Sequence, residues 1–505
     1  MNKTYELQQK RSQIIKGDGD EIIKKQHDAG KMIARERLET LFDEGSFVET
    51  DAFVKGRIEL ETNGAKSASE GVVCGYGTVF GRLCYAYAQD YTVSKGAFTA
   101  AHAEKICKIL DMALKMGAPV ISIFDSQGAK IEAGLEIAAG LGKILKKTAC
   151  LSGVVPQISV ILGACPGGMA FAPILSDFVV MSEKNSFMFL NGPSVSGEAD
   201  LSPEEFGGAE SCLVKGGTAE IVCKSEEECL KKAAELLEYL PSNNIESSPY
   251  SEEIDEINKL SDYLKTVSED MSTCDVKNII KEIADFGVYF ELSEKYAQNM
   301  VTAFIKLNGC TVGVIANQSK VMGGEIDVKA SKKAAEFLRT CDSFNIPVLT
   351  ITNTSGFSCK DEPSKILKAG AELVYSFAEA TVPKVNLITG KAFGNAYIAM
   401  NSKHIGADVV LAWPGAEISV INSESAANIL FAEEISNSEN PIEKRDELIK
   451  SYASNEASPY VAASLGYADD VIEADSSRPR LIAAFEMLAS KRETSVPKKH
   501  GNIPL

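Results

Sequence analysis

The stretch GRLCYAYAQDYTVSKGAFTAAHAEKICKILDMALKMGAPVISIFDSQG (81–128) reads as one copy of a unit that returns, without a gap, as GCTVGVIANQSKVMGGEIDVKASKKAAEFLRTCDSFNIPVLTITNTSG (309–356). Gly81 corresponds to Gly309, and the offset of 228 positions also aligns residues 96, 119 and 128 with 324, 347 and 356. Few identities survive, but glycines, turns and apolar runs keep their order. A repeat of this length indicates a duplicated domain rather than a solenoid unit.

Both copies predict strands that alternate with helices. In the first, 71–90 predicts a strand pair that turns at Phe80-Gly81, followed by a helix over 100–116, a strand at 119–125, a helix over 130–151 and a strand at 156–163. The second copy repeats the order, with strands at 310–317, 346–357 and 384–390 and helices at 329–344 and 368–381. Residues 1–50 look helical. Such alternation is typical of a mostly parallel sheet covered by helices, an α/β fold.

Composition narrows the function classes. The chain has 505 residues with 70 acidic and 52 basic side chains, a net charge of −18, which argues against nucleic acid or an anionic membrane as partner. No apolar run is long enough to span a membrane. Twelve cysteines without a CxxC pair indicate reduced thiols in a cytoplasm and argue against structural zinc. The polar stretch 241–275 predicts a boundary between two domains, 1–250 and 251–505.

Four loops at predicted strand ends are the candidate site. Ligands of parallel sheets gather at the C-terminal ends of strands, and small residues there let backbone N–H groups approach a ligand oxygen. The loops contain Gly128-Ala129, Gly167-Gly168 (within 164–168), Gly356-Phe357 and Asn395-Ala396 (within 391–397). The plainer interpretation is that these glycines only make tight turns, but four loops at equivalent places in two copies favour a site.

Conventional catalytic side chains are scarce. Only four histidines occur, at positions 27, 102, 404 and 500, and the acidic residues show no diagnostic spacing. This pattern leaves little room for a Ser–His or Cys–His mechanism. It points to catalysis by backbone donors, with the proton handled by substrate or cofactor, and enolate chemistry beside a thioester would fit.

Several motifs resemble the carboxyltransferase subunits of biotin-dependent acyl-CoA carboxylases, above all the β subunit of propionyl-CoA carboxylase and the α subunit of methylmalonyl-CoA decarboxylase. They include ARERLETLFDEGSFVE (34–49), GYGTVFGRLCYAYAQDYTV (75–93), SGVVPQISVILGACPGG (152–168), SKHIGADVVLAWPGAEI (402–418) and the tail over 478–505. The likeness covers nearly the whole chain in the correct order.

The resemblance implies two crotonase-type domains, an acyl-CoA side in 1–250 and a biotin side in 251–505, and a homo-hexamer whose active sites lie between the first domain of one subunit and the second domain of its neighbour. It implies that Gly128-Ala129 with Gly167-Gly168 polarise the thioester and that Gly356-Phe357 with Asn395-Ala396 face the ureido oxygen of biotin. Lys130, Tyr397 and Ile398 are then expected to contact substrate. Coenzyme A enters as part of the substrate, and no metal is needed.

The partners implied are acyl-CoA, a separate biotin carboxyl carrier protein, and either a biotin carboxylase subunit or a membrane decarboxylase subunit. Carboxylase and decarboxylase run the same half-reaction in opposite directions, so the holoenzyme stays open. Propionyl-CoA/methylmalonyl-CoA is the favoured substrate pair. The alternatives are a CoA-thioester enzyme that no longer uses biotin and a non-catalytic paralogue that serves in assembly.

Three departures from the family pattern are visible. Relatives read Asp-Ser-Gly-Gly-Ala-Arg where this chain has Asp125–Lys130, and lysine lacks the planar fork of arginine. Asp-Val-Pro-Gly-Phe becomes Asn353–Phe357, and Gly-Gly-Ala-Tyr-Asp becomes Gly394–Ile398. Asn395 still offers an N–H group, whereas Ile398 in place of an acid predicts a more apolar neighbouring pocket.

Overall fold

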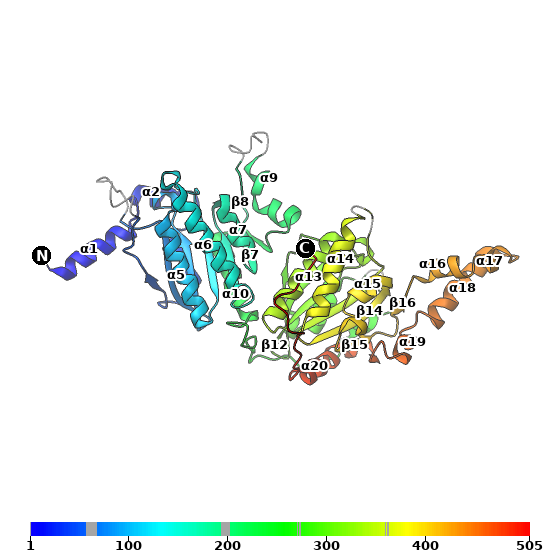
Figure 1. Cartoon of the computed structure of the whole chain (residues 1–505). Helices are drawn as coiled ribbons and strands as arrows, with labels where there is room; N and C mark the ends of the chain where they lie inside the picture. Colours follow the sequence, from blue (N-terminus) through cyan, green and yellow to red (C-terminus); the bar gives the residue numbers. More distant parts are fainter. Residues whose placement is uncertain are drawn as a thin grey trace. The chain divides into compact units, whose positions relative to one another are not determined.

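The structure is a computed structural model that describes residues 2–56, 68–192, 202–269, 271, 274–358, 360 and 363–504. The chain divides into two compact units, Met1–Ser247 and Ser248–Leu505. Figure 1 shows a sheet and its helices in each unit. Within the described ranges, no helix is both long and apolar enough to cross a membrane.

The first unit is built on a seven-stranded sheet in the order β1-β2-β3-β4-β5-β7-β9. Strands β1 to β3 pair antiparallel, and pairing is parallel from β3 onward. A small parallel pair, β6 with β8, lies beside it. The bounds are β1 (Val48–Thr50), β2 (Val72–Val79), β3 (Arg82–Gln89), β4 (Val120–Phe124), β5 (Gln157–Ile161), β6 (Ala164–Pro166), β7 (Phe178–Ser182), β8 (Phe187–Phe189) and β9 (Ile221–Cys223).

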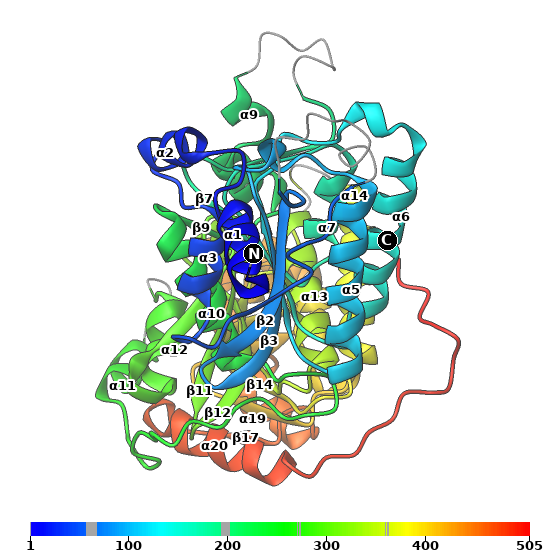
Figure 2. The same cartoon turned by 90° about the vertical axis from the view of Figure 1, so that its left-hand side faces the viewer.

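Helices cover both faces of this sheet. Figure 2 shows α3 and α10 on one side of β2 and β3, with α5 and α6 on the other. The bounds are α1 (Lys3–Ile15), α2 (Asp20–Asp28), α3 (Ala34–Leu41), α5 (Ala100–Met116), α6 (Leu135–Leu151), α7 (Phe171–Ile174), α9 (Pro203–Gly207) and α10 (Glu226–Tyr239).

Helix α5 shows how the sequence sets these boundaries. The Thr99 side chain accepts the N–H of His102 at 3.1 Å and so caps the first turn. Apolar residues at helical spacing, among them Ile106 and Leu110, are fully buried against the sheet. The helix ends at Gly117, which adopts the left-handed conformation at φ 60° that glycine tolerates best.

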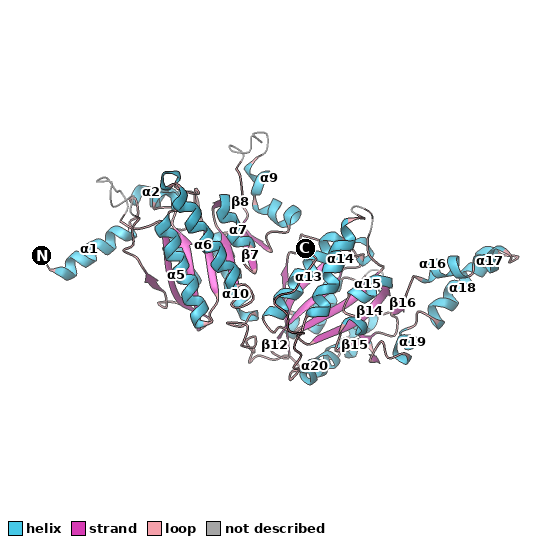
Figure 3. Ribbon diagram, in the orientation of Figure 1, coloured by secondary structure: helices cyan, strands magenta, loops and turns pink. Residues whose placement is uncertain are grey.

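The second unit repeats the plan with a sheet in the order β10-β11-β12-β13-β14-β15-β17, and β16 pairs with the end of β14. Figure 3 shows helices α13 and α14 in front of these strands. The strand bounds are β10 (Tyr289–Leu292), β11 (Met300–Leu307), β12 (Cys310–Asn317), β13 (Val348–Thr354), β14 (Lys384–Phe393), β15 (Val409–Ala412), β16 (Glu417–Ser419) and β17 (Asp470–Val471). The helix bounds are α11 (Asp262–Val267), α12 (Val276–Ile283), α13 (Val328–Ser343), α14 (Lys365–Glu379), α15 (Gly394–Ala399), α16 (Ser423–Leu430), α17 (Ala432–Ser436), α18 (Pro441–Asn455), α19 (Pro459–Ser464) and α20 (Ser477–Leu488).

The two sheets confirm the duplication at the level of register. Tyr85 of β3 lies opposite Val120 of β4, and the positions 228 residues later, Gly313 and Val348, lie opposite each other between β12 and β13. The predicted α/β class with two duplicated domains is therefore confirmed.

Four predicted segments differ from the structure. The helix expected over 130–151 begins only at Leu135, because Gly134 at φ 57° and ψ −137° interrupts it. The loop expected over 164–168 contains the strand β6 and then a 3₁₀ turn from Gly167 to Ala170. Of the loop expected over 391–397, the first three residues extend β14 and the rest begin α15. The helical start is also broken into three helices before β1.

His102 makes folding sensitive to acid. Its side chain is fully buried, and burial, helped by the charge of Lys105, lowers its pKa from 6.5 to about 3. The folded protein therefore keeps the ring neutral, whereas the unfolded chain takes up a proton below pH 6.5. We expect the free energy of unfolding to fall by about 1 kcal/mol per unit between pH 6 and pH 5 through this group. Urea denaturation of His102→Leu should show a weaker pH dependence over that interval, and an unchanged dependence would contradict the assignment.

Candidate functional site

The loop after β4 exposes a single free backbone donor. Five of the six N–H groups from Asp125 to Lys130 donate to oxygens inside the fold. Their acceptors are Gln89 Oε1 for Asp125 (3.1 Å), Ala164 O for Ser126 (2.9 Å), Lys95 O for Gln127 (3.0 Å), Ser126 Oγ for Gly128 (3.0 Å) and Phe98 O for Lys130 (3.1 Å). The N–H of Ala129 has no acceptor within the described part of the chain, and Ala129 itself is exposed.

The reason is a one-residue parallel bridge between Phe98 and Ala129. Phe98 donates its N–H to Gly128 O at 2.9 Å and accepts the N–H of Lys130, so the peptide groups of Ala129 itself point away from the bridge. Gly128 supplies the turn at φ 113°, a conformation that residues with a Cβ rarely adopt. Gly128 therefore shapes the loop, and Ala129 presents the donor.

The hydroxyl of Ser126 holds this turn together. It accepts the Gly128 N–H at 3.0 Å and donates to Gly96 O at 2.6 Å, and Ser126 is buried. Because Ser126→Ala leaves these polar groups without a partner, we expect a loss of about 1–3 kcal/mol in the free energy of unfolding. Ser126→Thr is the matched control, because Thr354 fills the same position in the second unit, and it should retain most of the stability. Urea denaturation measures both variants, and equal loss in both would contradict this role.

The second loop of the first unit lies against the first. A Cβ placed on Gly128 would lie 3.3 Å from Cγ of Pro166, the residue before Gly167. Gly167 has φ 72°, and Gly168 stands in the first turn of a 3₁₀ helix, where N–H groups lack an acceptor in their own helix. A Cβ on Gly168 would collide with Leu141 of α6. The structure thus brings Gly128-Ala129 and Gly167-Gly168 to one place at the C-terminal edge of the sheet.

The second unit reproduces the arrangement. Ile326 donates to Gly356 O at 2.9 Å and accepts the N–H of Ser358 at 2.9 Å, so Phe357 occupies the position of Ala129. Gly356, at φ 142°, donates its N–H to Thr354 Oγ1 at 3.3 Å. Within the residues that the structure describes, the N–H of Phe357 has no acceptor.

The loop after β14 completes the second set. Its Lys391 N–H donates to Asn353 Oδ1 at 3.0 Å, which joins it to the loop that ends in Phe357. Gly394 has φ 57°, and a Cβ there would lie 3.0 Å from Val420 O. Asn395 is exposed in the first turn of α15, and Ala396 is buried beneath it.

The side chains expected to contact substrate lie in different settings. Lys130 is half-buried at the end of its loop. Ile398 is 42% exposed. Tyr397 packs its ring against His404 with centroids 6.2 Å apart, and burial raises the pKa of its hydroxyl to about 12. Tyr397 therefore contributes to the core around α15 through its ring.

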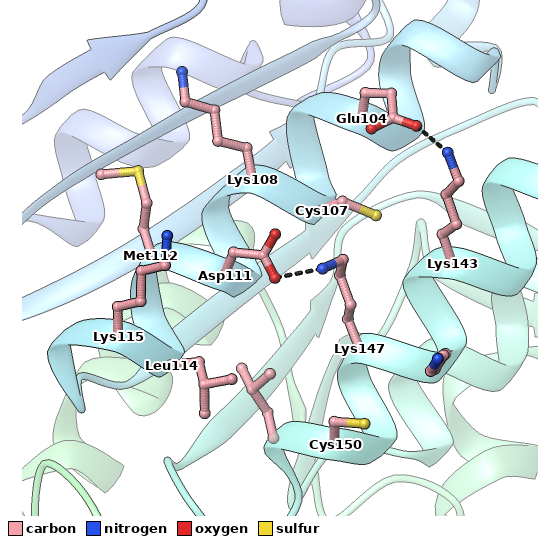
Figure 4. A pocket seen from close by; sticks show the side chains of 12 residues that line it. Glu104, Cys107, Lys108, Asp111, Met112, Leu114, Lys115, Lys143, Lys147 and Cys150 are labelled. Atoms are coloured by element: carbon pink, nitrogen blue, oxygen red, sulfur yellow. Dashed lines mark hydrogen bonds and ion pairs between the residues drawn. The ribbon is translucent and has the colours of Figure 1, made fainter.

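A groove between α5 and α6 is a separate feature, with a volume of about 730 Å³ (Figure 4). Two ion pairs cross it, Lys143 with Glu104 and Lys147 with Asp111. Its lining contains none of the loop residues described above: Glu104, Cys107, Lys108, Asp111, Met112, Leu114, Lys115, Lys143, Lys146, Lys147, Cys150 and Leu151. The loops at the sheet edge, rather than this groove, form the candidate site.

Sequence reasoning missed the side chains that brace these loops. Gln89 and Asn317 each accept the N–H of the residue that opens a loop, Asp125 at 3.1 Å and Asn353 at 3.3 Å. Gln89 and Asn317 occupy equivalent positions of the repeat, and this correspondence is the sequence feature from which their shared role could have been predicted. Ser126 and Thr354, also equivalent, are the second such pair.

The sequence and the fold match a known protein family and its solved structures. Residues 25–503 match the model of the carboxyl transferase domain. The chain is 45% identical to the methylmalonyl-CoA decarboxylase subunit alpha of Propionigenium modestum, over all of this chain and 99% of that protein. It is 43% identical to the propionyl-CoA carboxylase carboxyltransferase subunit of Haloferax mediterranei, over 99% and 98% of the two chains. A transcarboxylase 12S crystal structure with methylmalonyl-coenzyme A and methylmalonic acid bound superposes with a TM-score of 0.95 and 39% identity, over 99% of this chain and 98% of that one.

The fold and these matches define a class: this is a carboxyltransferase built from two crotonase-type domains. Within that class, the chain belongs to the carboxyl transferase family that contains the propionyl-CoA carboxylase β and methylmalonyl-CoA decarboxylase α subunits.

Proposed function

We propose that the chain moves a carboxyl group between carboxybiotin, carried on a partner protein, and a short-chain acyl-CoA, with propionyl-CoA and methylmalonyl-CoA as the substrate pair. The observation that supports this most is the repeated backbone donor: Ala129 in one unit and Phe357 in the other present an N–H group from equivalent loops. Two carbonyl oxygens can thus be held, one on each reaction partner.

In this proposal the first unit binds the thioester oxygen. The N–H of Ala129, with that of Gly168 from the neighbouring loop, stabilises the negative charge that develops on this oxygen when the acyl α-carbon loses its proton or its carboxyl group. Such donors act without reorganisation because their loops are already fixed by internal hydrogen bonds. Loss of one donor typically costs about 10²–10³ in rate.

The residues of the second unit fit the ureido oxygen of biotin. The N–H of Phe357 has no acceptor among the described residues, and Asn395 lies exposed in the adjoining first turn of α15, so neither position is closed by its own fold. Biotin supplies the carboxyl group and, after giving it up, the base for the acyl α-proton. Phe357 and Asn395 would hold its ureido oxygen through their N–H groups, and Ile398 would border the acyl chain.

Partners follow from the same proposal. The relatives are named as subunits of larger enzymes, and the transcarboxylase 12S protein is described as a hexamer assembly and a multienzyme core. We propose a homo-hexamer that works with a biotin carboxyl carrier protein and with a biotin carboxylase or a membrane decarboxylase subunit.

The test is conversion of methylmalonyl-CoA to propionyl-CoA by the purified protein, with and without free biotin. Turnover that depends on biotin supports the proposal. Turnover of the CoA thioester without biotin would favour a biotin-independent enzyme. Binding of acyl-CoA without turnover in either condition would favour a non-catalytic assembly subunit.

A further inference from the structure

A buried charged network lies directly behind the loop that presents Ala129. Asp125, the first residue after β4, is 1% exposed. Its carboxylate accepts a hydrogen bond from Gln26 Nε2 at 3.1 Å and one from Lys31 Nζ at 2.8 Å, and it pairs with Arg37 Nη2 at 2.9 Å. All three donors come from one short segment, 26–37, which is about 90 residues or more away in sequence.

The segment is itself fixed from the other side. Arg37 is fully buried and makes two hydrogen bonds to Glu226 of α10, at 2.9 Å from Nε and 2.7 Å from Nη2. Burial disfavours its charge, but Asp125 and Glu226 outweigh that effect and raise the pKa of Arg37 above its ordinary value. The main-chain N–H of Met32 also donates to Glu226, at 3.0 Å. The network therefore ties the loop to α10 through residues 26–37.

The fold leaves room for this carboxylate. Gly163 follows β5, and a Cβ there would collide with the carboxylate of Asp125 and lie 2.9 Å from Lys31 Nζ. A larger residue at 163 would thus expel the network. The absence of a side chain at this position is the local condition for the ion pairs.

In the second unit, the residue at the position equivalent to Asp125 is uncharged. Asn353 corresponds to Asp125, and its Oδ1 accepts the Lys391 N–H from its own sheet at 3.0 Å. The Asn353 side chain thus binds the adjacent strand of its own sheet, whereas the Asp125 side chain binds the remote segment 26–37. The negative charge of Asp125 therefore binds the cations of segment 26–37, Lys31 and Arg37.

We propose that Asp125 is a positioning residue for carboxyl transfer: clamped by Gln26, Lys31 and Arg37, it fixes residues 126–129 so that the Ala129 N–H stays directed at the substrate thioester oxygen. The proposal rests on the function proposed above. A donor of this kind acts only at about 2.7–3.1 Å from the developing charge. A misplacement of about 1 Å can cost on the order of 10² in rate.

The test compares Asp125→Asn with a matched control, Asp285→Asn. Asp285 is also buried, pairs with the buried Arg478 at 2.6 Å, and accepts two N–H groups of the β11–β12 turn, at the edge of the second sheet opposite to its loops. Asp125→Asn removes one of the two acids that bind the buried Arg37, and Asp285→Asn removes the acid that pairs with the buried Arg478, so both variants should lose stability. Only Asp125→Asn should lower kcat for biotin-dependent decarboxylation, by about tenfold or more, with KM for methylmalonyl-CoA within about threefold of wild type.

Hydrogen–deuterium exchange provides a readout that does not need activity. The amides of Ser126, Gln127 and Gly128 should exchange faster in Asp125→Asn and unchanged in Asp285→Asn. If the wild type shows no carboxyl transfer, the proposed function fails. The comparison of amide exchange at 126–128 between Asp125→Asn and wild type then still tests whether Asp125 positions this loop.

Gln26→Leu covers the case in which Asp125→Asn does not fold. It removes one neutral donor from Asp125 and leaves both cations, and it should lower kcat by about threefold with faster exchange at 126–128. The proposal is overturned if the folded Asp125→Asn or Gln26→Leu variant has the kcat and the amide exchange of the wild type. It is also overturned if Asp285→Asn loses kcat as much as Asp125→Asn does.

Discussion

Replacement of Gly128 by valine is expected to lower kcat for carboxyl transfer by about 10²–10³ while the protein stays folded. Gly128 has φ 113°, where a β-branched residue is strained by about 1–3 kcal/mol. A Cβ would also approach Pro166 to 3.3 Å. The peptide group that joins Gly128 to Ala129 should therefore rotate, and the Ala129 N–H would leave the position where it meets the thioester oxygen.

The control for this variant is Gly81→Val. Gly81 also has a positive φ, 73°, and nothing lies within 4 Å of its Cβ position. It forms the β2–β3 turn, which lies at the sheet edge opposite to the candidate loops because β3 and β4 run parallel. The control should lose stability and keep its kcat. A Gly128→Val enzyme with kcat within about threefold of wild type would contradict the role of this loop.

Replacement of Gly356 by valine should lower kcat for biotin-dependent transfer by a similar factor, about 10²–10³, and leave acyl-CoA affinity unchanged. Gly356 has φ 142° and directly precedes Phe357, whose N–H group the loop presents. Because the strained peptide lies in the second unit, the loss should appear in the step that involves biotin. Isothermal titration with propionyl-CoA measures the affinity, and decarboxylation with free biotin measures the rate.

Gly466→Val is the matched control in this unit, since Gly466 has φ 74° with open space around its Cβ position in the turn after α19. It should bind acyl-CoA and turn over as the wild type does. If Gly356→Val instead loses acyl-CoA binding and keeps its response to biotin, the assignment of the two units is reversed.

Much of this site could be predicted from the repeat, because its position depends on where strands end and on the backbone conformation of single glycines. Parallel strands end at one edge, and glycines at those ends mark backbone that must turn with a positive φ; Gly128 and Gly356 satisfy both conditions. Element ends were less predictable. Gly134 stops a helix through its own backbone conformation, and the extension of β14 to Phe393 depends on pairing with β16.

What the sequence could not predict depends on contacts between distant segments. Asp125 meets Lys31 and Arg37 across 94 and 88 positions, and no periodicity links such residues. The ring contact of Tyr397 with His404, and that of His404 with Tyr467, likewise join residues that no local pattern links. Burial of a polar side chain is decided by the assembled fold, so only the structure shows which side chains brace the site.

A crystal structure of the chain with methylmalonyl-CoA tests the role of Ala129 most directly. The thioester oxygen is expected at about 2.7–3.1 Å from the Ala129 nitrogen, with Gly128 still at a positive φ. A thioester bound elsewhere, with the Ala129 N–H facing solvent, would contradict this role.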